Sequence, residues 1–157
     1  MKKISLLLVV LLIAFAGCKK STSDQNAIDN KIILAYIQAN NLTATATGSG
    51  LYYVVTTQGD ATRPISTSTV YVKYRGYLLD GTKRGIQFDS SFEAGDQASQ
   101  FPMAQLTAGF REGLKLFGKG GKGQLIIPSS LGYGGNAAGV IPANSVLIFD
   151  IELVSFQ

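Results

Sequence analysis

An alternating segment in the middle of the chain constrains the fold more than any other feature. Between residues 69 and 79 (TVYVKYRGYLL), the side chains of Val70, Val72 and Tyr74 alternate with longer or more polar ones. A period of two places these three side chains on one face of an extended strand, whereas a helix would scatter them around its axis. The segment therefore predicts a half-buried β-strand, which requires partner strands.

Other segments rich in β-branched and aromatic residues predict those partners. They are LYYVVTT (51–57), a short strand at 87–89 after the Asp80-Gly81 turn, QLIIP (124–128) and SVLIFDIELVSF (145–156). Between them, AGFREGLKLF (108–117) places Phe110, Leu114 and Phe117 at helical spacing. Strands joined by short links, with one central helix, predict an α+β fold in which an antiparallel sheet packs over that helix.

The glycine run GKGGKG (118–123) matches the letters of the nucleotide-binding pattern G-x-G-x-x-G. In a dinucleotide-binding fold this pattern follows a strand and opens a helix, whose free N–H groups hold the phosphates. Here the run follows the predicted helix and precedes a strand, so Gly118 is predicted to be the left-handed residue that closes the helix. A phosphate-binding loop also needs a lysine where Gln124 stands. No nucleotide binding is expected.

The composition excludes several classes of chemistry. The 157 residues include no histidine and one cysteine, Cys18, so histidine triads, Cys–His dyads and Cys/His zinc sites are impossible. The ten acidic residues are dispersed, and no metal or other cofactor is expected. The net charge is +4, and two of the lysines, Lys2 and Lys3, lie in a removable segment, so no nucleic-acid partner is expected.

The first twenty residues, MKKISLLLVVLLIAFAGCKK, have the pattern of a secretory signal. Two lysines precede an apolar run at 4–15 that is too short to span a bilayer as a stable helix. The letters F-A-G-C resemble the bacterial lipobox, in which the cysteine is lipidated and becomes the mature N-terminus, so Cys18 is a predicted lipidation site. The alternative, a buried or disulfide-bonded cysteine, finds no second cysteine to pair with.

These features divide the chain into four parts. We expect a lipoprotein signal peptide at 1–17, a flexible tether at 18–26, an N-terminal helix and linker at 27–50, and the main domain at 51–157. The expected location is the cell envelope, at the outer membrane facing the periplasm or at the surface.

The N-terminal helix is predicted from an apolar stripe. Ile28, Ile32, Tyr36 and Ala39 recur at helical spacing, and the Asn-Asn pair after them is a stop signal. A helix this short needs a surface to pack against. Packing on the chain's own main domain is the favoured interpretation, and dimerisation is the alternative.

Three stretches in order then carry a family resemblance. VKYRGYLLDGT (72–82) leads into FDSS (88–91), LTAGFREGL (106–114) follows, and IIPSSLGYG (126–134) continues through VIPANSVLIFDIEL (140–153). Together they resemble the FKBP-type peptidyl-prolyl cis/trans isomerases, in a bacterial lipoprotein form, over residues 70–154. The resemblance implies an antiparallel sheet of about five strands wrapped around one short helix, with the N-terminal helix as an extension.

The resemblance also implies a pocket that takes a proline ring. Matched position by position, its residues are Tyr74, Phe88, Asp89, Phe101, Leu106, Thr107, Phe110, Tyr133, Val140, Ile141 and Phe149. In these roles Tyr133 would donate a hydrogen bond to a substrate carbonyl, and Asp89 would orient Tyr74 or polarise the amide. Phe110 would form the pocket floor, where a tryptophan is common in the family.

The implied activity is prolyl isomerisation, which assists the folding of exported proteins and uses no cofactor. The implied partners are proline-containing unfolded or extended polypeptides, macrolide immunosuppressants and, through the lipid, a membrane. Two other classes remain open: a chaperone or adaptor module that binds proline segments with little turnover, and a structural lipoprotein without pocket activity.

Overall fold

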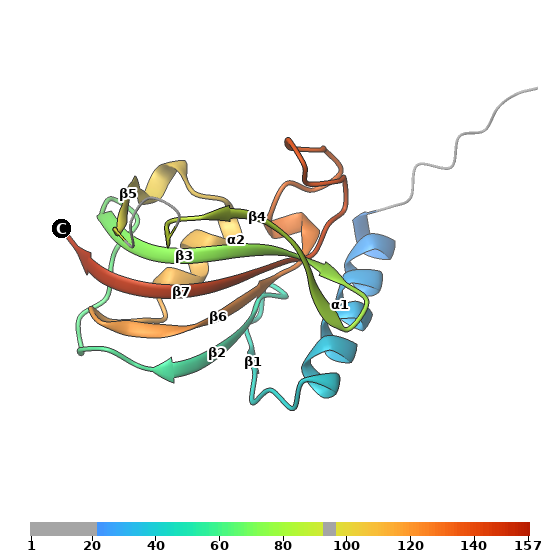
Figure 1. Cartoon of the computed structure of the whole chain (residues 1–157), viewed down its shortest axis with the longest axis horizontal. Coiled ribbons are helices and arrows are strands. Elements are labelled where there is room, and N and C mark those ends of the chain that lie inside the picture. Colours follow the sequence, from blue (N-terminus) through green and yellow to red (C-terminus); the bar gives the residue numbers. More distant parts are fainter. Residues whose placement is uncertain (1–21, 93–96) are drawn as a thin grey trace, which may run out of the picture.

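The computed structural model describes residues 22–92 and 97–157, so the predicted signal peptide and Cys18 lie outside the described residues. Within them an N-terminal helix precedes a domain of strands and short helices (Figure 1). The elements in chain order are α1 (Thr22–Ala39), β1 (Thr45–Ala46), β2 (Tyr52–Thr57), β3 (Thr69–Asp80), β4 (Lys83–Ser90), β5 (Ser99–Pro102), the 3-10 turn η2 (Met103–Gln105), α2 (Ala108–Leu114), β6 (Gly121–Ile127), the 3-10 turn η3 (Ser129–Leu131) and β7 (Leu147–Phe156).

The strands form one sheet in which all pairings are antiparallel. Their order is β1-β2-β6-β7-β3-β4, and β5 pairs with β3. The alternation that predicted β3 is confirmed, because Val70, Val72 and Tyr74 are buried while Arg75 is exposed. The predicted α+β class is confirmed as well. The sheet has seven strands rather than about five, because the short β1 and β5 carry no pattern long enough to recognise.

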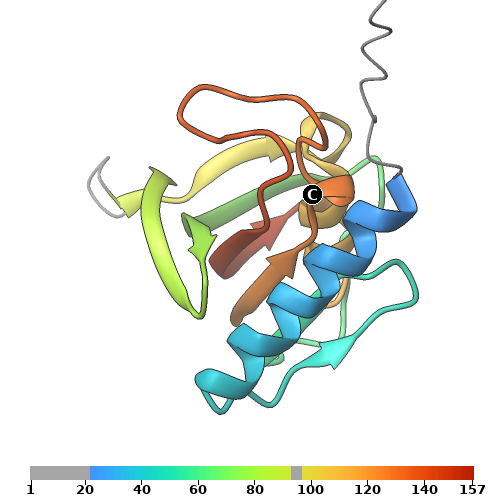
Figure 2. The same ribbon diagram turned by 90° about the vertical axis from the view of Figure 1, so that its right-hand side faces the viewer.

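The two faces of the sheet bury two separate cores. Leu125 and Ile127 of β6, with Leu147 and Phe149 of β7, belong to the larger core, which also includes Phe110, Leu114 and Phe117. The intervening Ile126 and Ile148 point to the opposite face, where they pack with Ile33 and Tyr36 of α1. This is the alternation expected of paired strands. Helix α1 thus covers the opposite face at one end of the strands (Figures 1 and 2).

The N-terminal helix begins earlier than predicted, and of the predicted stripe only Tyr36 is buried. It starts at Thr22, so residues 22–26 are helical and do not belong to a tether. Its buried residues are Asp29, Ile33 and Tyr36, whereas Ala39 is exposed. The apolar pattern missed Asp29 because a carboxylate is not expected inside a core. Packing of this helix on its own domain is confirmed.

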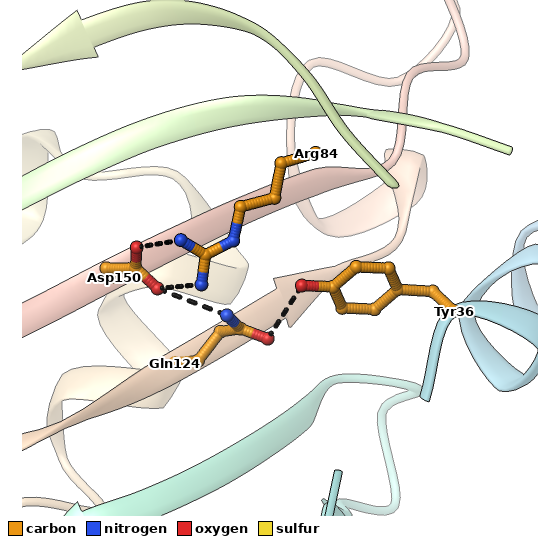
Figure 3. A network of polar contacts seen from close by, with 4 residues as sticks. All are labelled: Tyr36, Arg84, Gln124 and Asp150. Atoms are coloured by element: carbon orange, nitrogen blue, oxygen red, sulfur yellow. Dashed lines mark hydrogen bonds and ion pairs between the residues drawn. The ribbon is translucent and has the colours of Figure 1, made fainter. Parts of the chain in front are cut away.

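A polar network ties α1 to the sheet (Figure 3). The Tyr36 hydroxyl donates to Oε1 of Gln124 at 3.4 Å, and Nε2 of Gln124 donates to Asp150 at 3.1 Å. Asp150 also accepts two hydrogen bonds from the Arg84 guanidinium, at 2.6 and 2.7 Å. Four elements, α1, β4, β6 and β7, are joined through these side chains.

The segment around the glycine run differs from its prediction in two respects. The helix ends at Leu114, and the next three N–H groups bond three residues back, in a tighter turn. Gly118 does not adopt the predicted left-handed conformation, which occurs at Gly120 with φ 78°. Gly118 is required for close approach, because a Cβ there would collide with the backbone carbonyl of Asp60. The run reverses the chain between α2 and β6.

Among the described residues, no helix is long and apolar enough to cross a membrane.

Candidate functional site

A cavity of about 330 Å³ opens between the sheet and the segment η2–α2. Strands β3, β4, β5 and β7 contribute to it, as do the loop after η3 and the residues that enter α2. Its lining residues are Tyr74, Asp89, Phe101, Gln105, Leu106, Thr107, Phe110, Tyr133 and Phe149. Eight of the eleven predicted pocket residues are therefore brought together, from segments far apart in the sequence.

Aromatic rings form the inner wall of the cavity. The Phe149 ring lies at the centre of this cluster, with centroid distances of 4.7 Å to Phe110, 5.5 Å to Phe88 and 6.2 Å to Tyr74. The Tyr74 ring also lies 5.8 Å from that of Phe101. All of these pairs are tilted or edge-on, the arrangements that aromatic rings prefer. Mutual packing of this kind holds the wall in one shape.

A tyrosine–aspartate pair supplies the polar edge of the cavity. The Tyr74 hydroxyl donates to Oδ2 of Asp89 at 2.8 Å, while Oδ1 of Asp89 accepts the N–H of Ser90 at 2.8 Å. Burial, with help from the hydrogen bond to Asp89, raises the pKa of the Tyr74 hydroxyl above its ordinary value. The hydroxyl thus keeps its proton and remains a donor, and Asp89 remains fixed on Tyr74.

Strand β4 is held beside β3 at this point by a serine. Ser91 is 2% exposed, its N–H donates to the Tyr74 carbonyl at 3.0 Å, and its hydroxyl accepts the Tyr74 N–H at 2.9 Å. The last serine of the sequence FDSS therefore has a structural role, because it fixes the position from which Asp89 reaches Tyr74.

Tyr133 lies on the loop that follows η3. Tyr133 lines the cavity and is 40% exposed, so it is accessible to a bound molecule. Among the described residues that line the cavity, three carry a hydroxyl group: Tyr74, Thr107 and Tyr133.

Three of the predicted residues do not line the cavity. Phe88 packs edge-on against Phe149, which does line the cavity, and Ile141 is 5% exposed within the main core. Val140 is 65% exposed. The family pattern identifies a position in the alignment, but it does not distinguish a residue at the surface of a pocket from one that supports it.

Two residues that matter here were not predicted. Gln105 lines the cavity from η2, and no pattern in its surroundings indicates this. Gly76 lies beneath the aromatic wall, where a Cβ would come within 2.8 Å of the rings of Phe88 and Phe149. A glycine in the interior of a strand is a signal for such close packing and could have been used.

The cavity has the means to bind an apolar group with a polar edge. Asp89 is its one charged residue, and in the described part of the chain no three His, Cys, Asp or Glu side chains gather as metal ligands would. Its chemical resources are therefore aromatic surface, hydroxyl donors and a fixed carboxylate. These suit binding and desolvation of a planar polar bond.

Comparisons with known proteins agree with this geometry. The family model of the FKBP-type peptidyl-prolyl cis-trans isomerases matches residues 60–154. FKBP-type peptidyl-prolyl cis-trans isomerase FkpA of Aeromonas hydrophila is 41% identical over 88% of this chain and 51% of its own length. The FkpA of Escherichia coli K12 is 36% identical over 92% of this chain and 51% of its own.

Solved structures give the same result. The crystal structure of FkpA from Escherichia coli superimposes with a TM-score of 0.68 and 31% identity, covering 86% of this chain and 63% of that one. A peptidyl-prolyl cis-trans isomerase from Pseudomonas syringae has a TM-score of 0.71 and 25% identity, covering 90% and 99%. The chain spans about half the length of the curated relatives it matches.

Proposed function

The chain belongs to the FKBP-type peptidyl-prolyl cis-trans isomerase family, and we propose that it accelerates cis/trans isomerisation of X–Pro bonds in exported polypeptides. The observation that carries this proposal is the cavity lined by Tyr74, Asp89, Phe110, Tyr133 and Phe149. Its substrates are proline-containing unfolded or extended segments, and the same pocket is the proposed site for macrolide immunosuppressants.

The proposed catalysis follows from the physics of the amide bond. Rotation about the C–N bond has a barrier of about 18–20 kcal/mol because amide resonance must be broken. The planar amide has a large dipole, and the twisted transition state has lost much of it. Moving the bond from water to the aromatic surface of Phe110 and Phe149 therefore favours the twisted form, which is differential binding of the transition state. Each tenfold gain in rate needs only about 1.4 kcal/mol.

Polar groups at the edge of the cavity orient the substrate in this proposal. Tyr133 donates its hydroxyl hydrogen bond to a substrate carbonyl and so fixes the peptide relative to the aromatic wall. Asp89, held by Tyr74 at 2.8 Å, polarises the amide from the other side. No proton is transferred and no nucleophile attacks, so the absence of histidine from the sequence is compatible with this chemistry.

An isomerisation assay with Asp89→Ala tests the proposed function. We expect the purified protein to accelerate isomerisation of a prolyl peptide. Asp89→Ala should lower kcat/KM about tenfold, since the charge-assisted hydrogen bond between Tyr74 and Asp89 is lost. Asp80→Ala is the matched control, because Asp80 is an exposed carboxylate in the β3–β4 turn and does not line the cavity. It should retain full activity.

The outcomes separate the enzyme from its alternative. If the unaltered protein does not accelerate the reaction but binds prolyl peptides, the chain is a chaperone or adaptor module. If activity is present and insensitive to Asp89→Ala, the assignment of Asp89 is wrong.

We further propose that the protein is a cell-envelope lipoprotein. Residues 1–17 would be removed as a signal peptide, and Cys18 would carry the lipid that holds the protein near exported chains at the outer membrane. Mass spectrometry of protein from native membranes tests this. The N-terminal fragment is expected to begin at Cys18 and to carry the additional mass of attached acyl chains. An unmodified Cys18, or a retained residue 17, would contradict the proposal.

A further inference from the structure

A buried carboxylate links α1 to the loop that carries Tyr133. Asp29 is 0% exposed, and its Oδ2 accepts hydrogen bonds from the N–H of Ser129 at 2.8 Å and from the Ser129 hydroxyl at 2.6 Å. Its Oδ1 accepts Nε2 of Gln25 at 2.7 Å. Burial of a carboxylate is costly unless its oxygens are hydrogen-bonded, and here both oxygens are. Both oxygens of the buried Asp29 carboxylate are therefore hydrogen-bonded.

Ser129 is the first residue of η3, where a helical turn has unsatisfied N–H groups. The residue before it, Pro128, provides no side-chain cap. Asp29 performs the capping from α1, 100 positions away in the sequence. The start of the turn is consequently fixed by the N-terminal helix.

The carbonyl of Ser129 fixes the backbone on both sides of Tyr133. It accepts the N–H of Gly132 at 3.0 Å and the N–H of Gly134 at 2.8 Å, the residues on either side of Tyr133. The Gly134 carbonyl in turn accepts the N–H of Asn144 at 2.7 Å, which closes the base of the loop. Contacts that start at Asp29 therefore bracket the tyrosine.

External support of this kind is needed because the loop has little stiffness of its own. Gly132 and Gly134 flank Tyr133, and Gly134 adopts φ 60°. Glycines permit many backbone conformations, so a tyrosine between two of them is positioned by contacts and not by local preference.

We propose that Asp29 is a positioning residue for isomerisation, which acts through Ser129 to hold the Tyr133 hydroxyl at the cavity. This inference rests on the proposed function of the cavity. It makes α1 part of the functional unit, although no residue of α1 lines the cavity.

The test is a double-mutant cycle between Asp29 and Tyr133. Asp29→Ala is expected to lower kcat/KM about tenfold, because small misplacements of a positioned donor are costly. Tyr133→Phe should have a similar effect, and the double variant should be no worse than either single one, since both remove the same hydrogen bond to substrate. Asp29→Asn should keep activity within about twofold, because its amide oxygen can still accept both bonds from Ser129.

Tyr36→Phe is the matched control on the same helix. It removes the hydrogen bond to Gln124 without touching Ser129, so it should leave activity unchanged. Effects of Asp29→Ala and Tyr133→Phe that multiply to about a hundredfold would overturn the proposal, as would full activity of Asp29→Ala. Thermal unfolding identifies folded variants. If Asp29→Ala is unfolded, Ser129→Ala replaces it in the same cycle with a smaller expected loss, because it removes the hydroxyl bond to Asp29 and keeps the N–H bond.

Amide exchange separates this inference from the proposed function. The Gly134 N–H should exchange faster in Asp29→Ala than in the unaltered protein, since its partner Ser129 is no longer fixed. If the unaltered protein lacks isomerase activity, this measurement alone decides: faster exchange supports the positioning role, and unchanged exchange overturns it.

Discussion

Replacement of Phe149 by alanine is expected to reduce isomerase activity at least about a hundredfold and the free energy of unfolding by about 3–5 kcal/mol. The Phe149 ring lies against those of Phe110, Phe88 and Tyr74, and it is 8% exposed. Its removal leaves a void at the centre of the aromatic wall, into which the other rings can move. The loss should be seen in kcat/KM with a prolyl peptide, at a temperature where circular dichroism shows the variant folded.

Phe117→Ala provides the matched control for this prediction. Phe117 is 0% exposed and belongs to the same core, but it does not line the cavity. It should destabilise the protein by a similar amount in urea denaturation while the folded molecules keep their activity. Equal losses of activity in the two variants would show that the core as a whole, and not the wall, limits the reaction.

Gly123→Ala is expected to lower the free energy of unfolding by about 3 kcal/mol or more. Gly123 lies in β6 opposite Val55 of β2 and Ile151 of β7. An added Cβ would collide with the backbone carbonyl of Val54 and come within 2.8 Å of the Phe117 ring. A carbonyl in a paired strand cannot turn away as a side chain can, so the strand pairing itself must shift.

The comparison variant lies three residues earlier in the same run. Gly120 has φ 78°, and a Cβ added to it would meet nothing within 4 Å, so Gly120→Ala should cost about 1–2 kcal/mol through backbone strain alone. Urea denaturation of both variants measures the difference. A smaller loss for Gly123→Ala than for Gly120→Ala would contradict the close-approach explanation.

Periodicity and family pattern predicted what local sequence can encode. The alternation at Val70, Val72 and Tyr74 defined β3, and the motif FDSS located Asp89 at the cavity. These features depend on residues that are neighbours in the chain or that the family holds in a fixed order. They require no knowledge of which distant segments meet.

What could not be predicted depends on distant contacts. The burial of Asp29 becomes favourable only through Ser129, so the pattern of α1 alone gives no reason to place a carboxylate inside. The need for a glycine at position 118 comes from the carbonyl of Asp60, in another loop, and not from the helix that precedes it. In each case a contact with a distant residue, and not the local sequence pattern, determines which residue type the position requires.

The order of synthesis gives the packing of α1 a consequence for folding. This helix is made before the sheet, yet Tyr36 and Asp29 contact residues made 88 and 100 positions later. Most of the stability of a helix in a protein comes from packing of one face on the rest of the fold, and contacts across such separations form slowly. Docking of α1 is therefore expected among the last steps of folding. The Tyr133 loop would then reach its final conformation only in a molecule whose C-terminal strands are already in place. A partly synthesised chain would therefore present no complete site.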